Sequence, residues 1–299
     1  MLDGFNLNDG HYCLVFECLG RSLYDFMKGH DYTPFPLYCV RDFARQLLDA
    51  LDFMHGFGLI HTDLKPENIL LTDNRERTYT SCNERGSDSK KQHQQHQQQV
   101  PYSTAIKVID FGGATYDNEK KSSVINTRQY RAPEVILELG WSTPSDLWSL
   151  GCILAELYIG ELLFETHDND EHLALIERIV GRFPPMMIRN TKLKSSLSFS
   201  SSATVTTYAS KSPRSNHTNN YNNNTHGGST ALFDGNGWHR MGDILSSSSL
   251  EHVRTRLDLD SMVLDCDRSS GLGLLLRSLL VMDPRMRKTA YATRKLPFL

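Results

Sequence analysis

The sequence predicts an α+β chain with a small amount of β-structure near its start and a large helical body after it. Two observations lead to this prediction. Short apolar runs at residues 12–17, 69–71 and 105–109 have the length and composition of strands. Elsewhere apolar residues recur at helical spacing, and residues 147–159 are apolar nearly all round, which is typical of a helix buried inside a domain.

The helices have recognisable starts and ends. Ser22, with Asp25 three residues later, is typical of a helix N-terminus. An apolar stripe at helical spacing then precedes Gly56, a natural helix end, and consists of Val40, Phe43, Leu47, Leu51 and Met54. Further helices are predicted over about residues 168–180 and 270–282, with a short one near 290.

Composition excludes several classes of protein. The 299 residues carry a formal net charge of −3, so we expect no direct nucleic-acid binding. The longest apolar run, about 272–282, is interrupted by Arg277 and is too short to span a membrane. No secretory signal is predicted, and the six cysteines form no regular framework, so we expect reduced thiols inside the cell.

Two stretches differ sharply in composition from the rest. Residues 72–104 are rich in Gln, His and Ser, and residues 192–230 are rich in Ser, Asn and Thr. Neither has apolar periodicity, so both are predicted to be disordered insertions. His93 and His96 have the spacing of metal ligands, but a solvated glutamine-rich tract is the favoured interpretation.

The segment 61–68, His-Thr-Asp-Leu-Lys-Pro-Glu-Asn, carries the strongest chemical signal. Asp63 is suited to orienting a nucleophilic hydroxyl and accepting its proton, and Lys65 to stabilising the charge on a transferred phosphoryl group. Asn68 offers the hard oxygen ligand that Mg²⁺ prefers. Taken alone, the segment could also be an ordinary polar loop between a helix and a strand.

Two further motifs follow in order. Asp110, in Asp-Phe-Gly, stands at the end of a predicted strand and could bind the same metal ion. Residues 127–134, Thr-Arg-Gln-Tyr-Arg-Ala-Pro-Glu, form the third element. Each motif is weak alone, but the three in this order and structural context make a phosphotransfer site the favoured hypothesis.

With these elements the chain resembles a eukaryotic protein kinase of the LAMMER (CLK-like, CMGC group) family that is truncated at its N-terminus. Residues 171–181, Glu-His-Leu-Ala-Leu-Ile-Glu-Arg-Ile-Val-Gly, differ from that family's signature helix only by apolar-for-apolar exchanges. Thr62, where most kinases have arginine, is also typical of the family. Asp168 and Gly181 suit the caps of this helix, so we interpret it as structural.

The resemblance implies a protein-kinase-like fold in two parts. Residues 1–19 would be a remnant of the β-rich small lobe and the hinge. Residues 20–299 would be the mainly α-helical C-terminal lobe, with both insertions inside it.

The resemblance also implies roles for individual residues. The implied nucleotide contacts are Phe16 as the gatekeeper at the back of the adenine pocket, Glu17 and Leu19 as backbone partners of the adenine edge, and Leu70 beneath the ring. Asn68 and Asp110 would hold Mg²⁺. Thr127 would join Asp63 and Lys65 in the catalytic group.

Two more implied roles are structural. Asp146 would brace the catalytic loop from the buried helix. Glu134 would pair with Arg287, because a buried carboxylate and a buried guanidinium are expected only together.

The implied activity is that of a serine/threonine or dual-specificity kinase, which transfers the γ-phosphate of ATP to protein hydroxyls. The implied cofactors are ATP and Mg²⁺, and the implied substrates are Arg/Ser-rich splicing factors. A monomer in the nucleus, and also in the cytoplasm, is expected.

Three parts of a kinase nevertheless have no counterpart in the sequence: the Gly-rich loop, the strand lysine and the helical glutamate. Lys107 imitates the lysine motif, but its strand runs directly into Asp110. Either the sequence is part of a longer kinase, which the retained catalytic residues favour, or it is a catalytically impaired scaffold with a kinase fold.

Overall fold

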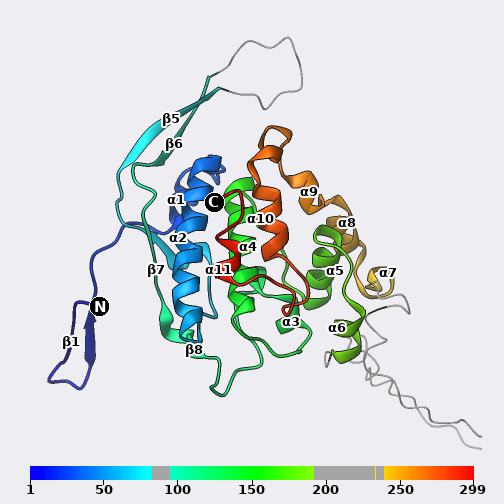
Figure 1. Ribbon diagram of the computed structural model, residues 1–299, viewed down its shortest axis with the longest axis horizontal. Helices are drawn as coiled ribbons and strands as arrows, with labels where there is room; N and C mark the ends of the chain where they lie inside the picture. Colours follow the sequence, from blue (N-terminus) through cyan, green and yellow to red (C-terminus); the bar gives the residue numbers. More distant parts are fainter. Residues whose placement is uncertain (83–94, 192–232, 234–238) are drawn as a thin grey trace, which may run out of the picture.

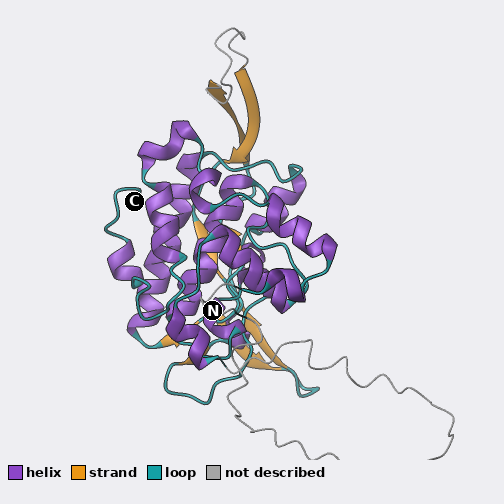
Figure 2. Ribbon diagram, turned by 90° about the vertical axis from the view of Figure 1, so that its right-hand side faces the viewer, coloured by secondary structure: helices purple, strands orange, loops and turns teal. Residues whose placement is uncertain are grey.

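The computed structural model describes residues 1–82, 95–191, 233 and 239–299. Helices form the body of the molecule, and short strand pairs lie along one side of it (Figure 1). Two β-hairpins project from this body (Figure 1, Figure 2). The predicted α+β fold class is therefore confirmed.

The helical body is built around two long helices, α2 (Leu37–Gly56) and α4 (Pro144–Ile159). The predicted apolar stripe of α2 is buried, and α4 is buried along nearly its whole length, as the sequence predicts. α10 (Leu272–Leu279) packs on α4, and α11 (Ala290–Thr293) packs on α2. These contacts create the core that carries the catalytic segments.

Two short strand pairs enclose residues 61–68, the predicted catalytic loop. β3 (Leu59–Ile60) pairs with β8 (Thr115–Tyr116), and β4 (Ile69–Leu71) pairs with β7 (Ile106–Val108). Both pairs are antiparallel. The loop therefore begins at the end of β3, and β7 ends just before Asp110.

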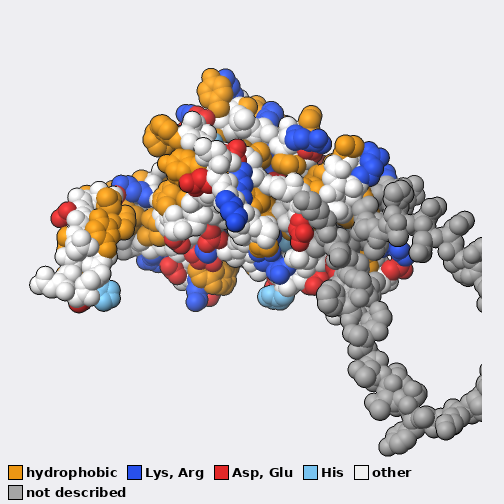
Figure 3. Space-filling model, turned by 90° about the horizontal axis from the view of Figure 1, so that it is seen from below, with side chains coloured by type: hydrophobic (Ala, Val, Ile, Leu, Met, Phe, Trp, Pro, Cys, Tyr) orange, Lys and Arg blue, Asp and Glu red, His pale blue; other side chains and the backbone are white. Residues whose placement is uncertain are grey.

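The first hairpin stands apart from the body. β1 (Asp3–Asn6), which the sequence did not reveal, pairs with β2 (Tyr12–Val15) in antiparallel register. Apolar side chains on this protrusion are exposed (Figure 3), and they include Phe5, Tyr12, Leu14 and Phe16.

The second hairpin corrects a prediction. β5 (Glu76–Cys82) and β6 (Gln95–Pro101) pair along seven residues each, so the ends of the insertion predicted as disordered are ordered. Val100 is buried and the ring of Tyr79 lies 5.4 Å from that of Tyr38, so a few apolar side chains anchor a polar ribbon. Its backbone pairing does not depend on hydrophobic composition. Residues 83–94, with His93, and the second predicted insertion, 192–230, lie outside the described residues.

The remaining helices are short. Ser22 caps α1 (Leu23–Gly29) and Asp168 caps α5 (Asn169–Ile179), as predicted. Five α-helices were not predicted: α3 (Pro133–Ile136), α6 (Pro185–Asn190), α7 (Met241–Ile244), α8 (Ser247–Thr255) and α9 (Leu259–Met262). The 3-10 helices are η1 (Pro66–Asn68), η2 (Phe111–Gly113), η3 (Arg128–Tyr130) and η5 (Asp265–Ser270). Within the described ranges, no helix has both the length and the apolar content to cross a membrane.

Gly160, the residue that ends α4, is expected to tolerate no side chain. Its φ is +83°, and an added Cβ would lie 2.4 Å from the carbonyl oxygen of Tyr32. Gly140 has nearly the same φ, +85°, but an added Cβ would meet no atom within 4 Å. We expect Gly140→Ala to cost about 1 kcal/mol of unfolding free energy and Gly160→Ala at least about 3 kcal/mol, measured by urea denaturation. Equal losses would contradict this account of the α4 end.

Candidate active site

The start of the catalytic loop is held in place by one buried carboxylate. Asp146, in the first turn of α4, accepts the backbone N–H of His61 at 2.9 Å and that of Thr62 at 3.1 Å. Nε2 of His55 lies 3.0 Å from the same carboxylate. Thr62 has φ +70°, so the two bonds stabilise a turn that a β-branched residue rarely adopts. The predicted bracing role of Asp146 matches these contacts.

Removing one acceptor from Asp146 is expected to loosen this turn. Asp146→Asn should lower the unfolding free energy by about 2–3 kcal/mol, because one amide oxygen replaces two acceptors for buried N–H groups. Thermal or urea unfolding measures the effect. The matched control is Asp243→Asn, because the Asp243 side chain is 60% exposed. A loss in the control as large as in Asp146→Asn would contradict the bracing role.

Asp63, Lys65 and Thr127 form a closed group of contacts. Nζ of Lys65 donates to Oδ2 of Asp63 at 2.7 Å and to Oγ1 of Thr127 at 3.2 Å. Thr127 donates from Oγ1, at 2.8 Å, and from its backbone N–H, at 3.1 Å, to Oδ1 of Asp63. These three predicted residues therefore meet although 62 or more positions separate Thr127 from the other two.

These contacts keep the Asp63 carboxylate ionised at neutral pH. Burial by itself raises the pKa of Asp63, but hydrogen bonds from Lys65 and Thr127 and the charge of Lys65 outweigh it. The net effect holds the pKa below its usual value. A half-buried carboxylate that is fixed on both oxygens can orient a hydroxyl and accept its proton as charge develops.

Asn68 and Asp110 offer a donor set that fits Mg²⁺. Nδ2 of Asn68 donates to the carbonyl oxygen of Asp63 at 2.9 Å, and no described residue donates to its amide oxygen, which can therefore face a cation. Asp110 is exposed and has φ +64°, and a hydrogen bond from Ile109 N to Asn68 O, 3.0 Å, joins the two segments. One amide oxygen and one carboxylate suit a hard cation that phosphate oxygens and water also ligate. No cluster of three His, Cys, Asp or Glu side chains suited to a metal occurs among the described residues.

None of the four residues implied for adenine binding lines either of the two pockets described below. Phe16, which directly follows β2, is 60% exposed. The side chain of Glu17 forms an ion pair with that of Lys107. Lys107 in turn lies opposite Leu70 in the β4–β7 strand pair. Leu19 is partly buried. Their roles therefore stay predictions, whereas Lys107 is shown to lie in the strand before Asp110.

Glu134 and Arg287 form the predicted buried pair. Both side chains are fully buried, and the guanidinium donates to the two carboxylate oxygens at 2.8 and 3.0 Å. Arg287 also donates to the carbonyl oxygen of Pro144 at 2.7 Å and lies over the ring of Trp148, 5.2 Å from its centre. The pair therefore connects α3, which contains Glu134, to the segment between α10 and α11, which contains Arg287.

A pocket of about 420 Å³ opens beside Thr127, and sequence reasoning missed it. Its lining combines residues from several segments: Tyr24, Tyr32, Glu67, Thr127, Gln129, Tyr130, Glu156, Gly160, Glu161, Leu162 and Glu165. Four of these are glutamates and none is Lys or Arg. We call it the acidic pocket. The available signal was Glu156, the one charged residue in an otherwise apolar stretch of α4.

Two carboxylates inside the acidic pocket lack a cation among the described residues. Oε2 of Glu67 is buried without a hydrogen-bond partner there. Glu156 accepts only the hydroxyl of Tyr130, at 2.7 Å, within the described chain. Burial, with a smaller contribution from the charge of Glu67, raises the pKa of Glu156 to about 7. Both groups would be stabilised by a cation entering from solvent.

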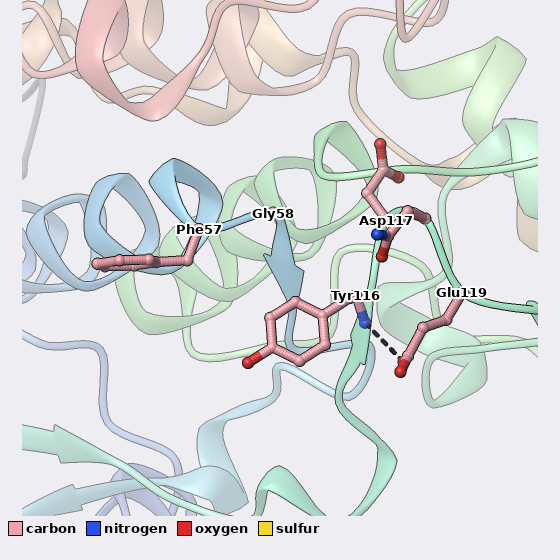
Figure 4. A pocket seen from close by; sticks show the side chains of 6 residues that line it. Phe57, Gly58, Tyr116, Asp117 and Glu119 are labelled. Atoms are coloured by element: carbon pink, nitrogen blue, oxygen red, sulfur yellow. Dashed lines mark hydrogen bonds between the residues drawn. The ribbon is translucent and has the colours of Figure 1, made fainter.

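A larger hollow, about 780 Å³, lies elsewhere, at the end of α2 beside β8 (Figure 4). Its walls are Phe57, Gly58, Tyr116, Asp117, Asn118 and Glu119. In Figure 4, Glu119 bends back to the backbone N–H of Tyr116, and the Asp117 carboxylate points away from the Tyr116 ring. None of the predicted catalytic residues lines this hollow, so it is not the reaction site.

The comparisons with known proteins agree with this geometry. The family model described as "Protein kinase domain" matches residues 1–299. Human "Dual specificity protein kinase CLK2" is 51% identical over 193 residues, which cover 64% of this chain and 36% of CLK2. "Serine/threonine-protein kinase Doa" of Drosophila melanogaster is 50% identical over 199 residues, which cover 65% of this chain and 22% of Doa.

A solved structure shows the same likeness. The crystal structure of the PF14_0431 kinase domain aligns with a TM-score of 0.78 and 34% identity, and it covers 99% of this chain and 75% of that chain. The matches to CLK2 and Doa span about a third or less of those relatives' own length.

Proposed function

The chain belongs to the protein kinase family, and we propose that it transfers the γ-phosphate of ATP to serine or threonine hydroxyls of proteins. The observation that supports this most directly is the contact group of Asp63, Lys65 and Thr127. It fixes a carboxylate and an ammonium group side by side, and a phosphotransfer reaction needs both.

In this proposal Asp63, Lys65 and Thr127 have separate roles in the transfer. Oδ1 and Oδ2 of Asp63 orient the substrate hydroxyl, and the carboxylate accepts its proton. Nζ of Lys65 stabilises the charge that spreads over the transferred phosphoryl oxygens. Thr127 holds Asp63 in place from the opposite segment, through the two hydrogen bonds to Oδ1.

The amide oxygen of Asn68 and the carboxylate of Asp110 would hold Mg²⁺. When bound, Mg²⁺ neutralises the negative charge on the phosphate oxygens of ATP. Asp146 and the His61–Thr62 backbone keep Asn68 and Asp63 on one rigid loop, because Asn68 donates directly to the Asp63 carbonyl oxygen.

The acidic pocket supports a basic substrate. It lies against Thr127, which contacts the catalytic carboxylate, so a residue near the acceptor hydroxyl would reach Glu67 and Glu156. A guanidinium in the pocket can form charge-assisted hydrogen bonds with the carboxylates of Glu67 and Glu156, and Oε2 of Glu67 has no partner among the described residues. We therefore propose Arg/Ser-rich proteins as the substrate class. On the family resemblance we also propose that the protein is a monomer in the nucleus, with some of it in the cytoplasm.

Binding of an Arg/Ser peptide is expected to depend on pH through Glu156. Its pKa is raised to about 7, so the carboxyl is mostly neutral at pH 6 and ionised at pH 8. Affinity for the cationic peptide should therefore rise as pH increases through 7, and Glu156→Gln should remove most of this dependence and weaken binding about 10-fold at pH 8.

Fluorescence anisotropy with a labelled peptide measures both effects. The control is Glu251→Gln, which removes an exposed carboxylate on α8. If wild type and Glu156→Gln show the same affinity from pH 6 to pH 8, the acidic pocket is not the arginine site.

A further inference from the structure

The acidic pocket also has an aromatic side, which takes no part in the steps assigned to its carboxylates. Tyr24, on α1, and Tyr32, in the turn after α1, line the pocket together with Glu67 and Glu156. The rings of Tyr24 and Tyr32 lie 6.2 Å apart at 61°, an edge-to-face arrangement, and their hydroxyl oxygens are 3.4 Å apart. These two rings form one wall of the pocket, which we call the tyrosine wall.

The backbone holds Tyr32 at the pocket in a conformation that few side chains adopt. Asp31 and Tyr32 have φ values of +51° and +53°, in the left-handed region. A bulky residue is an outlier there and persists only where its surroundings fix it. The N–H of Tyr32 donates to the carbonyl oxygen of Met27 at 2.8 Å, and the carbonyl oxygen of Tyr32 lies so close to Gly160 that no Cβ fits there. The turn therefore fixes the Tyr32 backbone against the end of α4, the helix that carries Glu156.

The charges in the pocket direct an entering cation to one part of it. Two of the four glutamates, Glu161 and Glu165, already have a cation, because Arg256 lies 3.6 Å and 2.8 Å from their carboxylates. Glu67 and Glu156 have no cation among the described residues, and Oε2 of Glu67 is buried without a hydrogen-bond partner there. A cation from solvent is therefore stabilised most beside Glu67 and Glu156.

The tyrosine wall lies in this same part of the pocket. α1, which carries Tyr24, packs against η1, which carries Glu67. The pKa of Tyr24 is raised first by its hydrogen bond with Tyr32 and, among weaker causes, by the charge of Glu67. Nζ of Lys28 lies 5.9 Å from the centre of the Tyr24 ring, whereas no described cation lies over the Tyr32 ring. A ligand cation beside Glu67 can therefore also reach an aromatic face.

We propose that the tyrosine wall makes the acidic pocket selective for arginine over lysine, by stacking against the guanidinium that Glu67 and Glu156 bind. This proposal rests on the proposed function. A guanidinium is planar, so it can lie on an aromatic ring and still donate in its plane to carboxylates. The ammonium group of lysine is compact and strongly hydrated and has no such flat face. Carboxylates alone attract both cations, so a choice between them needs the second kind of contact that the wall supplies.

The test is a set of anisotropy titrations of the full chain with two labelled peptides. One is an Arg/Ser peptide, and the other has lysine at each arginine position and so carries the same charge. We expect wild type to bind the arginine peptide about 10-fold more tightly. Tyr32→Leu should reduce this preference to about 2-fold, mainly by weakening the arginine peptide, whereas Tyr32→Phe should keep it because the ring remains.

A second variant avoids the left-handed backbone of Tyr32. Tyr24→Leu changes a residue within α1 and should reduce the preference about 3-fold, and melting curves show that each variant is folded. Tyr291→Leu is the matched control, because Tyr291 is 58% exposed on α11 and does not line the acidic pocket. Its preference should equal that of wild type.

Equal affinity of wild type for both peptides would overturn the proposal and leave the proposed function standing. An unchanged preference in both Tyr24→Leu and Tyr32→Leu would also overturn it. Equal weakening of both peptides by folded Tyr32→Leu would show a general apolar contact, and loss of the preference in Tyr32→Phe would assign it to the hydroxyl group, so either result contradicts stacking. No binding of either peptide would overturn both the proposal and the proposed function.

Discussion

Asp63→Asn is expected to lower the rate of phosphoryl transfer to a peptide serine by about 10³-fold while leaving the fold intact. The amide keeps the size of the side chain but cannot accept the hydroxyl proton, which accounts for about 10²–10⁴ in rate. It also turns a donor toward either Lys65 or Thr127, both of which donate to Asp63. Initial rates with saturating MgATP, together with a melting curve, measure the two outcomes.

Two further variants make this prediction sharper. Asp260→Asn is the matched control, since the Asp260 side chain is 68% exposed, and its rate should equal that of wild type. Thr127→Val removes one of the two hydrogen bonds to Oδ1 of Asp63 and should slow transfer by only about 10-fold. A larger loss for Thr127→Val than for Asp63→Asn would contradict the roles assigned to these residues.

The second large effect concerns stability. Glu134→Gln and Arg287→Met should each lower the unfolding free energy by about 3–5 kcal/mol, because each leaves a fully buried charge without its partner. The double variant Glu134→Gln/Arg287→Met should lose less than the sum of the single changes, since no uncompensated charge remains. Urea denaturation of the four chains completes a double-mutant cycle.

An exposed pair serves as the control for this cycle. Arg240 and Asp243 are 2.6 Å apart, and their side chains are 44% and 60% exposed. Arg240→Met should therefore leave the urea midpoint unchanged, because water screens this pair. Additive effects of the two buried changes would show that Glu134 and Arg287 do not act as a pair.

Much of the site could be predicted because its residues belong to short motifs with chemical meaning. Asp63, Lys65 and Asn68 lie on one loop, and their types and spacing indicate phosphotransfer without a structure. Thr127 came from the third motif, and its contact with Asp63 is confirmed at 2.8 Å. The long helices were predictable for a similar reason, because their apolar stripes have a clear period.

The acidic pocket was not predictable in the same way. Glu67, Glu156 and Glu165 lie on three different segments, and tertiary packing, including that of α4 against η3 and of α1 against η1, brings them together. A tertiary cluster of this kind has no sequence spacing to recognise.

The β5–β6 hairpin was missed for a different physical reason. Composition predicts whether a segment can bury apolar area, but a two-stranded ribbon needs only backbone pairing and a few anchors such as Val100 and Tyr79. A glutamine-rich sequence satisfies that condition as well as an apolar one. The short helices α7 and α9 have four residues each, which is too few for a helical period to show.

The central claim is that this chain transfers phosphate to serines flanked by arginines. Mass spectrometry of an Arg/Ser peptide after incubation with the purified chain and MgATP tests it most directly. We predict phosphate on the peptide serines with wild type, less when the peptide arginines are replaced by glutamine, and none above background with Asp63→Asn. Absence of phosphate with wild type, or the same amount with Asp63→Asn, would contradict the claim and favour a kinase-fold scaffold.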